Sequence, residues 1–357
     1  MRPTRNYRIP VMRPMLPGMA NLTPRLKRIE QSGVFSNSGP QLLELERRMG
    51  DRLGVSADRI VILANATLAL TGLTQLLKLE TWRVPSWTFT ATSLAVLAAG
   101  KTAVFVDVNL DTHRQITTPM TASNSLVTLP FGVGVPESWT SVDDFPPLID
   151  AAASLGSINT LAGLPHHSNV VFSLHATKYL GAGEGGLVVA GTEEIAQELR
   201  SWSNFGFQGS RESGIQGTNA KMSELQAAVV HCALDTEAAE RETWEELRKL
   251  SSAQDERLGI GIPSLAQRSI APYWIVRFDS EELRNIAEAT LSRASIESRR
   301  WWSAGCHQMP AFNGVSVEGD LANTNQLAAE TLGLPYFRGM KEAHFEEIGN
   351  AIISAIA

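Results

Sequence analysis

Apolar residues recur at two spacings along the chain, and the alternation between them predicts an α/β fold. In PQLLELERRMGDRLGV, Leu42, Leu45, Met49 and Leu53 lie at the spacing of one helix face, and Gly54 follows as a stop. Short apolar runs then occur in RIVIL, WRVP, KTAVFVDV, NSLVTL and PPLID, the last of which runs into helix-like, alanine-rich sequence. This order is typical of a largely parallel sheet that is covered by helices on both faces.

The composition of the chain changes after residue 235 and predicts two domains. Residues 36–235 carry the alternating pattern, in which VVFSLHATKYL and GGLVVAG predict an antiparallel or sharply turned pair around a glycine-rich loop. Residues 236–258 form one long charged stretch without glycine or proline, which predicts a helix that links the domains. Residues 259–357 mix PYWIVRFDS with helical stretches and predict a smaller α+β domain.

The first 35 residues are expected to form an N-terminal arm. Four prolines among the first twenty residues disfavour a helix there. Because N-terminal segments are ordered only when other parts of the protein hold them, an extended segment on the main domain or on a neighbouring subunit is expected. A partly disordered tail is the alternative.

Charge and cysteine content exclude several classes of protein. The 357 residues carry a formal net charge of -6 and only short basic clusters, which argues against nucleic acid as a partner. No apolar stretch has the length of a signal-peptide core or of a membrane span, so a membrane is not expected as a partner either. Cys232 and Cys306 are far apart and have no CxxC partner, so neither a disulfide framework nor a metal site is expected, and a reducing cytoplasm fits best.

Polar and aromatic residues follow the predicted strands, at the places where open α/β sheets bind ligands. They are Asn65, Ala66, Thr67, Trp87, Thr88, Phe89, Asp107, Asp150, Ser173, His175, Thr177 and Lys178. The turn from Asn65 to Thr67 could present backbone N–H groups to an anion at a helix N-terminus, although an ordinary N-cap needs no ligand. Asp107 could bind a ribose or begin a turn, and the turn is favoured.

Asp150 and Lys178 carry the strongest chemical signal, because each places a charge at the end of an apolar run. A buried carboxylate stays ionised only beside a positive charge, such as a protonated pyridine nitrogen, and an N-cap aspartate is the alternative. A desolvated lysine forms Schiff bases with carbonyl groups, whereas a lysine that reaches back to solvent is the alternative. Together with the anion turn and the aromatic strand end, the two residues meet the needs of pyridoxal phosphate.

These residues, in this order, resemble the DegT/StrS family of sugar aminotransferases, which have the type I aminotransferase fold. The similar motifs span nearly the whole chain: IPVMRPMLP, SNSGP, NATLAL, PSWTFTAT, FVDV, IDAA, SLHATKYLGAGEGG and GTNAKMSELQAA. The resemblance implies a mostly parallel seven-stranded sheet flanked by helices, with a smaller C-terminal α+β domain. The sequence departs from the family at Asn65 and Ala66, where Ser-Gly is commoner, at Ile149, where Glu is usual, and at Ala153, where Gln or His is usual.

The resemblance assigns the catalytic roles to two residues. It implies that Lys178 forms the internal aldimine with pyridoxal 5'-phosphate and, once freed by the substrate amine, moves a proton between cofactor and substrate carbons. It implies that Asp150 keeps the pyridine nitrogen protonated, so that the ring can accept electrons. Pyridoxamine phosphate is the implied intermediate form of the cofactor.

The resemblance also implies the cofactor contacts around these two residues. Phe89 is expected to stack on the ring, with Trp87 less favoured. Asn219 matches an asparagine that reaches the phosphate from the neighbouring subunit, so a homodimer with shared active sites is implied. The remaining residues that contact the cofactor, or support those that do, lie in the turn from Asn65 to Thr67, called the phosphate turn, and in SLHATKYLGAGEGG, called the lysine motif. They are Asn65, Ala66, Thr67, Ser173, His175 and Thr177.

The implied activity is transfer of an amino group from L-glutamate to a nucleotide-linked 4-keto-6-deoxyhexose, with dTDP as the favoured nucleotide. The product is a 4-amino-4,6-dideoxy sugar for a polysaccharide such as O-antigen, or for a glycosylated metabolite. NAKMSELQAA favours amination at carbon 4, because the enzymes that act at carbon 3 usually carry an Arg-Leu-Asp version of it. A carbon-3 aminotransferase, a dehydratase of the same fold and a non-catalytic relative are the alternatives.

Three residues are expected to contact the substrate. Trp302 and His307 lie in RRWWSAGCHQMPAF, where the family has an aromatic and histidine segment near the sugar nucleotide, and ordinary packing is the alternative. Arg211 lies in the glycine-rich stretch GFQGSRESGIQG and is a candidate pyrophosphate contact. That loop and the N-terminal arm could close over a nucleotide.

Overall fold

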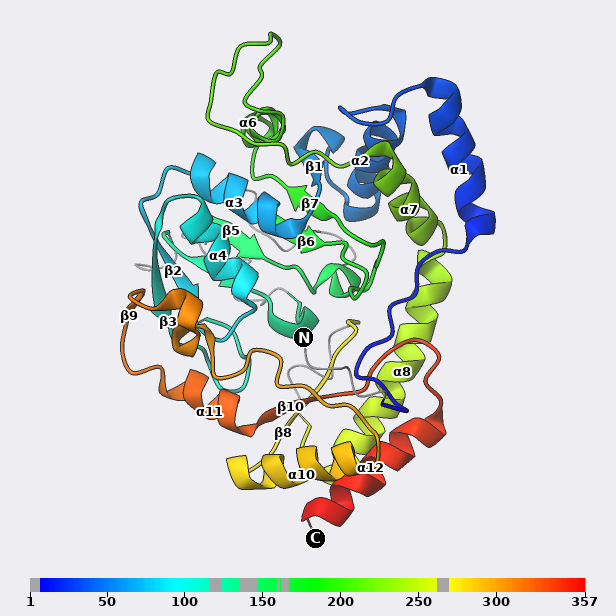
Figure 1. Ribbon diagram of the computed structural model, residues 1–357, viewed down its shortest axis with the longest axis vertical. Coiled ribbons are helices and arrows are strands. Elements are labelled where there is room, and N and C mark those ends of the chain that lie inside the picture. Colours follow the sequence, from blue (N-terminus) through cyan, green and yellow to red (C-terminus); the bar gives the residue numbers. More distant parts are fainter. Residues whose placement is uncertain are drawn as a thin grey trace.

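The computed structural model describes residues 7–115, 123–134, 147–158, 161, 167–261 and 270–356. We call the part that carries the main sheet the large domain, and the part after helix α8 the small domain (Figure 1). The large domain contains α2 (Pro40–Leu53), β1 (Ile60–Leu63), α3 (Ala66–Leu76), β2 (Thr81–Pro85), α4 (Thr90–Ala98), β3 (Thr102–Val106), β4 (Leu126–Thr128), β5 (Leu148–Asp150), β6 (Asn169–Ser173), β7 (Gly186–Val189), α6 (Glu193–Ser203) and α7 (Glu224–Asp235). Helix α1 (Met19–Ser32) precedes it, and α8 (Glu237–Leu258) follows it. The small domain contains β8 (Trp274–Arg277), α10 (Glu281–Arg293), β9 (Ser316–Val317), α11 (Ala322–Glu330), β10 (Thr331–Leu334) and α12 (Glu342–Ile356).

The main sheet is mostly parallel, as the sequence predicts. Five strands pair in the order β1-β7-β6-β5-β4, and a second group pairs in the order β2-β3-β9. The two groups join at Arg83, whose backbone N–H donates to the carbonyl of Asn124 (2.9 Å). Strand β7 runs antiparallel to both of its neighbours, which confirms the predicted antiparallel pair around the glycine-rich loop.

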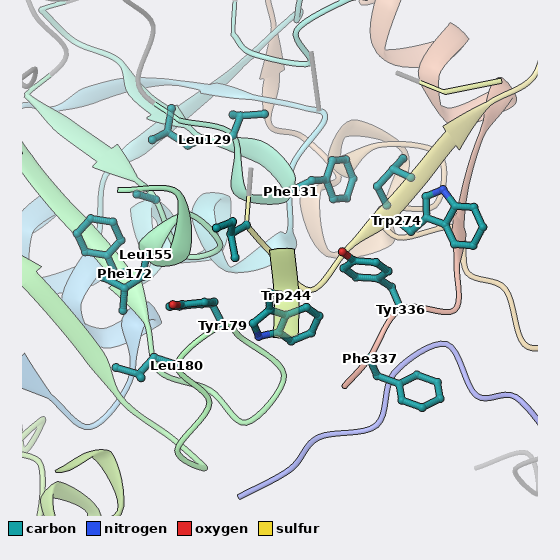
Figure 2. Close-up of a cluster of buried hydrophobic side chains, with 14 of the residues drawn as sticks. Leu129, Phe131, Leu155, Phe172, Tyr179, Leu180, Trp244, Trp274, Tyr336 and Phe337 are labelled. Atoms are coloured by element: carbon teal, nitrogen blue, oxygen red, sulfur yellow. The ribbon is translucent and has the colours of Figure 1, made fainter. Parts of the chain in front are cut away.

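Alternate residues of each central strand point into two different cores, one on each face of the sheet. Ile62 of β1 and Phe172 of β6 belong to the core that also contains residues of α2, α8 and the small domain. Their neighbours Val61 and Val171 belong to the core under α3, α4 and α6. Figure 2 shows part of the first core, in which Phe172 and side chains of the small domain such as Tyr336 lie in one cluster. The buried strands read as continuous apolar runs because both faces are covered.

Helix α2 begins and ends where the sequence pattern predicts. Leu45 and Met49 are fully buried on its inner face, and Gly54 ends the helix with a left-handed φ of 68°. Its first free N–H groups, those of Gln41 and Leu42, donate to the buried carboxylate of Glu224 on α7 (2.7 and 3.0 Å). The carboxylate therefore caps α2 from another helix, at the end where a negative charge is favoured.

The N-terminal arm lies on both domains of its own chain: helix α1 packs against α7 of the large domain, as expected, and the segment before α1 lies on the small domain. The backbone N–H of Arg8 donates to the carbonyl of Ser295 (2.9 Å), and Ile9 pairs with Ile296. Ile9 and Val11 are buried, which explains the position, because these alternate apolar residues need an apolar partner surface. The later part of the arm, Met19–Ser32, forms α1, which follows the proline-rich opening for which the extended conformation is expected. Figure 1 shows the dark-blue segment running beside α8 between α1 and the small domain.

Two further features concern helices: the conformation of the chain after β5 and the length of the apolar helices. The alanine-rich stretch after β5 forms a turn and a short 3₁₀ helix at Leu155–Ser157, not a longer helix. Among the described residues, no helix is both long enough and apolar enough to cross a membrane.

Candidate active site

The carboxyl ends of the parallel strands meet at one edge of the sheet and bring several predicted site residues together. In the pairing register, Gly186 at the start of β7 lies opposite both Leu63 of β1 and Ser173 of β6. Asp150, at the end of β5, lies opposite Val171 of β6. The turn before α3, the end of β5 and the loop after β6 therefore line the same edge, the usual ligand site of an open α/β sheet.

The turn before α3 combines an ordinary N-cap with an anion-binding arrangement. The side-chain oxygen of Asn65 accepts from the backbone N–H of Leu68 (2.8 Å), as an N-cap does. The N–H groups of Ala66 and Thr67 have no hydrogen-bond partner among the residues that the structure describes. A Cβ at Gly186 would lie 2.7 Å from the nitrogen of Ala66, so only glycine lets β7 pass this close to the turn. A phosphate group fits such a helix N-terminus.

Asp150 is buried and held by two hydrogen bonds. One oxygen accepts from the hydroxyl of Thr92 on α4 (2.8 Å), and the other accepts from the backbone N–H of Ala152 (3.0 Å). The single hydroxyl proton of Thr92 is used in the bond to Asp150, so the hydroxyl of Thr88 is the donor in its bond to Thr92 (3.0 Å). The three side chains form a short series of hydrogen bonds. Burial raises the pKa of Asp150, while Thr92, Ala152 and the nearby charge of Lys178 oppose the rise. The site thus holds a carboxylate that a positively charged ring nitrogen would stabilise.

Replacing Thr92 with valine is expected to weaken the binding of pyridoxal phosphate by about 5- to 30-fold, because a buried acceptor loses its donor. The substitution keeps the shape of the side chain and removes only the hydroxyl that donates to Asp150. Titrating the apoprotein with pyridoxal phosphate, followed by visible absorbance, measures the affinity. Thr92→Ser should restore most of it, and Thr90→Val on the same helix should have no effect. Equal affinities for Thr92→Val and the unchanged protein would contradict the role given to Thr92.

Lys178 lies in the loop between β6 and β7. Backbone hydrogen bonds within this loop fix its conformation. The N–H of Leu174 donates to the carbonyl of Gly185 (2.9 Å), and the N–H of Ala176 donates to that of Gly183 (2.8 Å). The amino group of Lys178 donates to the hydroxyl of Tyr273, with a distance of 2.7 Å between Nζ and Oη. Tyr273 is not among the predicted site residues, because an uncharged residue in an ordinary apolar stretch carries no signal of chemistry in the sequence.

The other residues of the lysine motif support this loop. The imidazole Nδ1 of His175 lies 2.8 Å from the hydroxyl of Thr177, and its Nε2 lies 3.8 Å from Glu184. The hydroxyl of Ser173 accepts from the backbone N–H of His175 (3.2 Å). Ser173 is buried next to Gly186, so its hydroxyl lies beside the phosphate turn.

Of the two aromatic residues at the end of β2, only one has an exposed ring. Phe89, at the N-cap of α4, is 62% exposed and lies one turn before Thr92, the residue that bonds Asp150. Trp87 is 2% exposed and packs edge-on against Trp302 (5.0 Å between ring centroids). Phe89 is therefore the ring that is free to cover a cofactor, and its stacking role stays a prediction.

The structure gives the three predicted substrate contacts different surroundings. Trp302 is nearly buried and stacks on Phe131, with 4.1 Å between ring centroids and 12° between planes. His307 lies with its Nδ1 2.7 Å from the hydroxyl of Ser86, and burial lowers its pKa. Arg211 is exposed on the loop after α6, which projects from the body of the molecule (Figure 1).

Backbone and side-chain hydrogen bonds place the segment of Asn219 beside the end of β1, and Asp107 at the start of α11. Asn219 is exposed in the segment that pairs with the end of β1, where the N–H of Ala64 donates to the carbonyl of Ala220 (2.8 Å). Both oxygens of Asp107 accept from the first turn of α11, from the backbone N–H groups of Asn323 (2.9 Å) and Thr324 (2.8 Å). Asp107 thus caps a helix of the small domain. Among the described residues, no cluster of His, Cys, Asp and Glu side chains could hold a metal ion.

Comparison with known proteins identifies the family. A model of the DegT/DnrJ/EryC1/StrS aminotransferase family matches residues 19–122 and 144–353. The chain is 27% identical to the dTDP-4-amino-4,6-dideoxy-D-glucose transaminase of Shigella dysenteriae, with 96% of this chain and 97% of that protein covered.

Solved structures agree. A putative PLP-dependent aminotransferase from Bacillus cereus superposes with a TM-score of 0.86 and 25% identity, covering 96% of this chain and 99% of that one. DesI, solved in the presence of its TDP-sugar product, gives 0.82 and 29%, covering 98% and 93%. These neighbours confirm the predicted type I aminotransferase fold, and the pyridoxal phosphate that the family implies fits the edge where Asp150 and Lys178 meet. The match over most of the chain shows that this protein is an aminotransferase and belongs to the DegT/DnrJ/EryC1/StrS family.

Proposed function

We propose that the protein is a pyridoxal-phosphate-dependent aminotransferase that acts on a nucleotide-linked keto sugar. The observation that carries the proposal is the position of the amino group of Lys178 and the buried carboxylate of Asp150 at one edge of the sheet, where the charge of Lys178 lowers the pKa of Asp150 against the effect of burial. When bound there, pyridoxal phosphate supplies a carbonyl carbon that takes up an amino group and a ring that stabilises negative charge on the adjacent carbon.

Each surrounding residue has one task in this proposal. Asp150 pairs its negative charge with the ring nitrogen, and Lys178 anchors the cofactor and moves a proton to and from the substrate carbon. The N–H groups of Ala66 and Thr67 bind the phosphate at the start of α3, where the helix dipole favours an anion. The exposed ring of Phe89 covers one face of the cofactor.

The proposed amino donor is L-glutamate, and the proposed acceptor is a dTDP-linked 4-keto-6-deoxyhexose. The support for the acceptor is the similarity, over 96% of this chain, to a protein named dTDP-4-amino-4,6-dideoxy-D-glucose transaminase. A carbon-3 keto sugar is the second candidate, because a Streptomyces venezuelae relative named dTDP-3-amino-3,4,6-trideoxy-alpha-D-glucose transaminase is 29% identical over 71% of this chain. Arg211, Trp302 and His307 are the proposed substrate contacts.

The proposed assembly is a homodimer with shared active sites. Large apolar side chains are exposed around the connection between α1 and α2 and on α7, namely Val34, Phe35, Leu43 and Leu225. Exposed apolar side chains that gather on one surface favour an interface with another chain. In the proposed dimer, the exposed Asn219 completes the phosphate site of the other subunit.

A panel of keto-sugar nucleotides tests the proposal. The purified protein, loaded with pyridoxal phosphate, is incubated with L-glutamate and with 4-keto or 3-keto sugars carried on dTDP, UDP or GDP. Mass spectrometry identifies the amino sugar, and the amount of 2-oxoglutarate formed gives the stoichiometry. Amination of the dTDP-linked 4-keto sugar is expected, and turnover of the 3-keto sugar alone would favour the second candidate. A loaded protein whose visible spectrum does not change with glutamate would contradict both.

A further inference from the structure

Among the described residues of the small domain, Tyr273 contacts the amino group of Lys178. The hydroxyl Oη of Tyr273 lies 2.7 Å from Nζ of Lys178, and this Nζ lies 5.3 Å from the centre of the phenol ring. Tyr273 comes directly before β8 and is separated from Lys178 by 95 positions in the chain. The contact therefore depends on how the segment before β8 packs against the large domain.

Two glycines of the large domain fix the position of that segment. A Cβ at Gly132 would lie 2.1 Å from the Cβ of Ala271, and a Cβ at Gly156 would lie 2.2 Å from the carbonyl oxygen of Ile270. Both distances are far below van der Waals contact, so the segment rests on bare backbone at both points. Gly132 also has a φ of +87°, which disfavours any other residue. The backbone that carries Tyr273 is thus held close to the sheet edge.

Aromatic neighbours fix the phenol ring itself. The ring packs edge-on against Phe131 of the large domain, with 5.8 Å between centroids, and against Trp301 of the small domain, with 5.2 Å. Phe131 in turn stacks on Trp302, and Figure 2 shows Phe131 in the same apolar cluster as Trp274. Edge-on and stacked contacts between aromatic rings stabilise the ring positions by more than the burial of apolar area alone would. The hydroxyl therefore has a defined place, and that place is at Nζ of Lys178.

A phenol at this place suits a lysine that must be held both with and without its extra proton. A phenol oxygen accepts a hydrogen bond from an ammonium group, and the same hydroxyl donates to the lone pair of a neutral amine. When the amine of Lys178 takes a proton from a substrate carbon, the phenol changes from donor to acceptor and keeps its own proton. The ring of the bound cofactor would stabilise the electron pair left on the carbon, so the phenol itself neither gains nor loses a proton. Without such a partner, the long lysine side chain samples many rotamers.

We propose that Tyr273 is a positioning residue, which holds the amino group of Lys178 in place for attachment to the cofactor and for proton transfer. The inference rests on the proposed function, because it presumes that Lys178 is the anchor of pyridoxal phosphate. It adds a residue of the small domain to the machinery at the sheet edge, and it ties the geometry of the site to the packing of residues 270–273 on Gly132 and Gly156.

The test is Tyr273→Phe, which keeps the ring contacts and removes the hydroxyl. The rate at which apoprotein captures pyridoxal phosphate, measured by stopped-flow absorbance, is expected to fall about 10-fold, and kcat is expected to fall about 10- to 100-fold. The KM for glutamate should stay within about threefold, since Tyr273 acts on the amine of Lys178 and not on substrate binding. The melting temperature of the apoprotein should not change, because the substitution keeps the ring contacts. A purely structural role would instead lower it.

The matched control is Tyr179→Phe, since Tyr179 is the chain neighbour of Lys178 and its hydroxyl does not contact Nζ. Capture by Tyr273→Phe at the rate of this control, with kcat also equal, would overturn the proposal. Capture needs only apoprotein and pyridoxal phosphate. If the unchanged protein captures the cofactor and Tyr273→Phe matches it, the role of Tyr273 fails alone. If the unchanged protein does not capture it, the proposed function fails.

Discussion

Lys178→Ala is expected to abolish amino transfer, with a loss of at least about 10⁴-fold in kcat, because anchoring and proton transfer are lost together. The side chain extends from a loop that is closed by backbone hydrogen bonds, so the fold should be unaffected. The measurement is the formation of amino sugar and 2-oxoglutarate, with circular dichroism and the melting temperature as checks of folding. The visible band that follows loading of the unchanged protein should be absent.

Lys101→Ala is the matched control, because this lysine pairs with Glu80 on the surface of the large domain and should not affect turnover. Mixing inactive Lys178→Ala with Asn219→Ala tests the shared site in the same series. If the sites are shared, mixed dimers regain one site that has both residues, and activity returns on mixing. Amino transfer by Lys178→Ala at a rate close to that of the unchanged protein would show that the central assignment is wrong.

Asp150→Asn is expected to lower kcat by about 10²- to 10⁴-fold, because a neutral amide cannot pair with a charged ring nitrogen in a buried site. The substitution keeps the size of the side chain and leaves the hydroxyl of Thr92 within reach of an acceptor. Steady-state turnover measures the loss, and an exposed aspartate of the small domain offers the control Asp279→Asn.

The stability of the apoprotein separates this role from a structural one. Burial raises the pKa of Asp150, so the folded apoprotein binds its proton more tightly than the unfolded chain does. The apoprotein should therefore lose stability as the pH rises from the ordinary pKa of an aspartate towards the raised value, and Asp150→Asn should not show this loss. A large drop in the melting temperature of Asp150→Asn across that range would favour a structural role instead.

Local patterns in the sequence predicted the parts of the fold that local forces decide. The face of α2 with Leu45 and Met49, its stop at Gly54 and the antiparallel pair around the glycine-rich loop follow from spacing and from glycine conformations within a few residues. The strand end that carries Asp150 could be predicted for the same reason, since the carboxylate directly follows an apolar run, whereas Lys178 lies beyond the end of β6 at Ser173, in the loop.

Contacts between distant segments could not be predicted in this way. The apolar character of Ile9 indicates burial, but its partner Ile296 lies far along the chain and carries no matching signal. Tyr273 is uncharged and lies in an ordinary strand pattern, so its place at Lys178 appears only in three dimensions. The indole of Trp302 presents the same problem, because the sequence does not distinguish an aromatic residue that contacts a substrate from one that stacks on another ring, as Trp302 does on Phe131.

The pairing of β9 with the edge of β3 has a consequence for dividing the chain. Ser316 and Val317 follow the linking helix in the chain, yet they pair with Val104 and Phe105 of β3 and so add a strand to the sheet of the large domain. A polypeptide that ended at Leu258 would leave this edge of β3 unpaired, and it would also uncover the glycines on which residues 270–273 rest. We therefore expect that a protein cut at the end of α8 does not give two independently folding pieces, although the two domains are divided there.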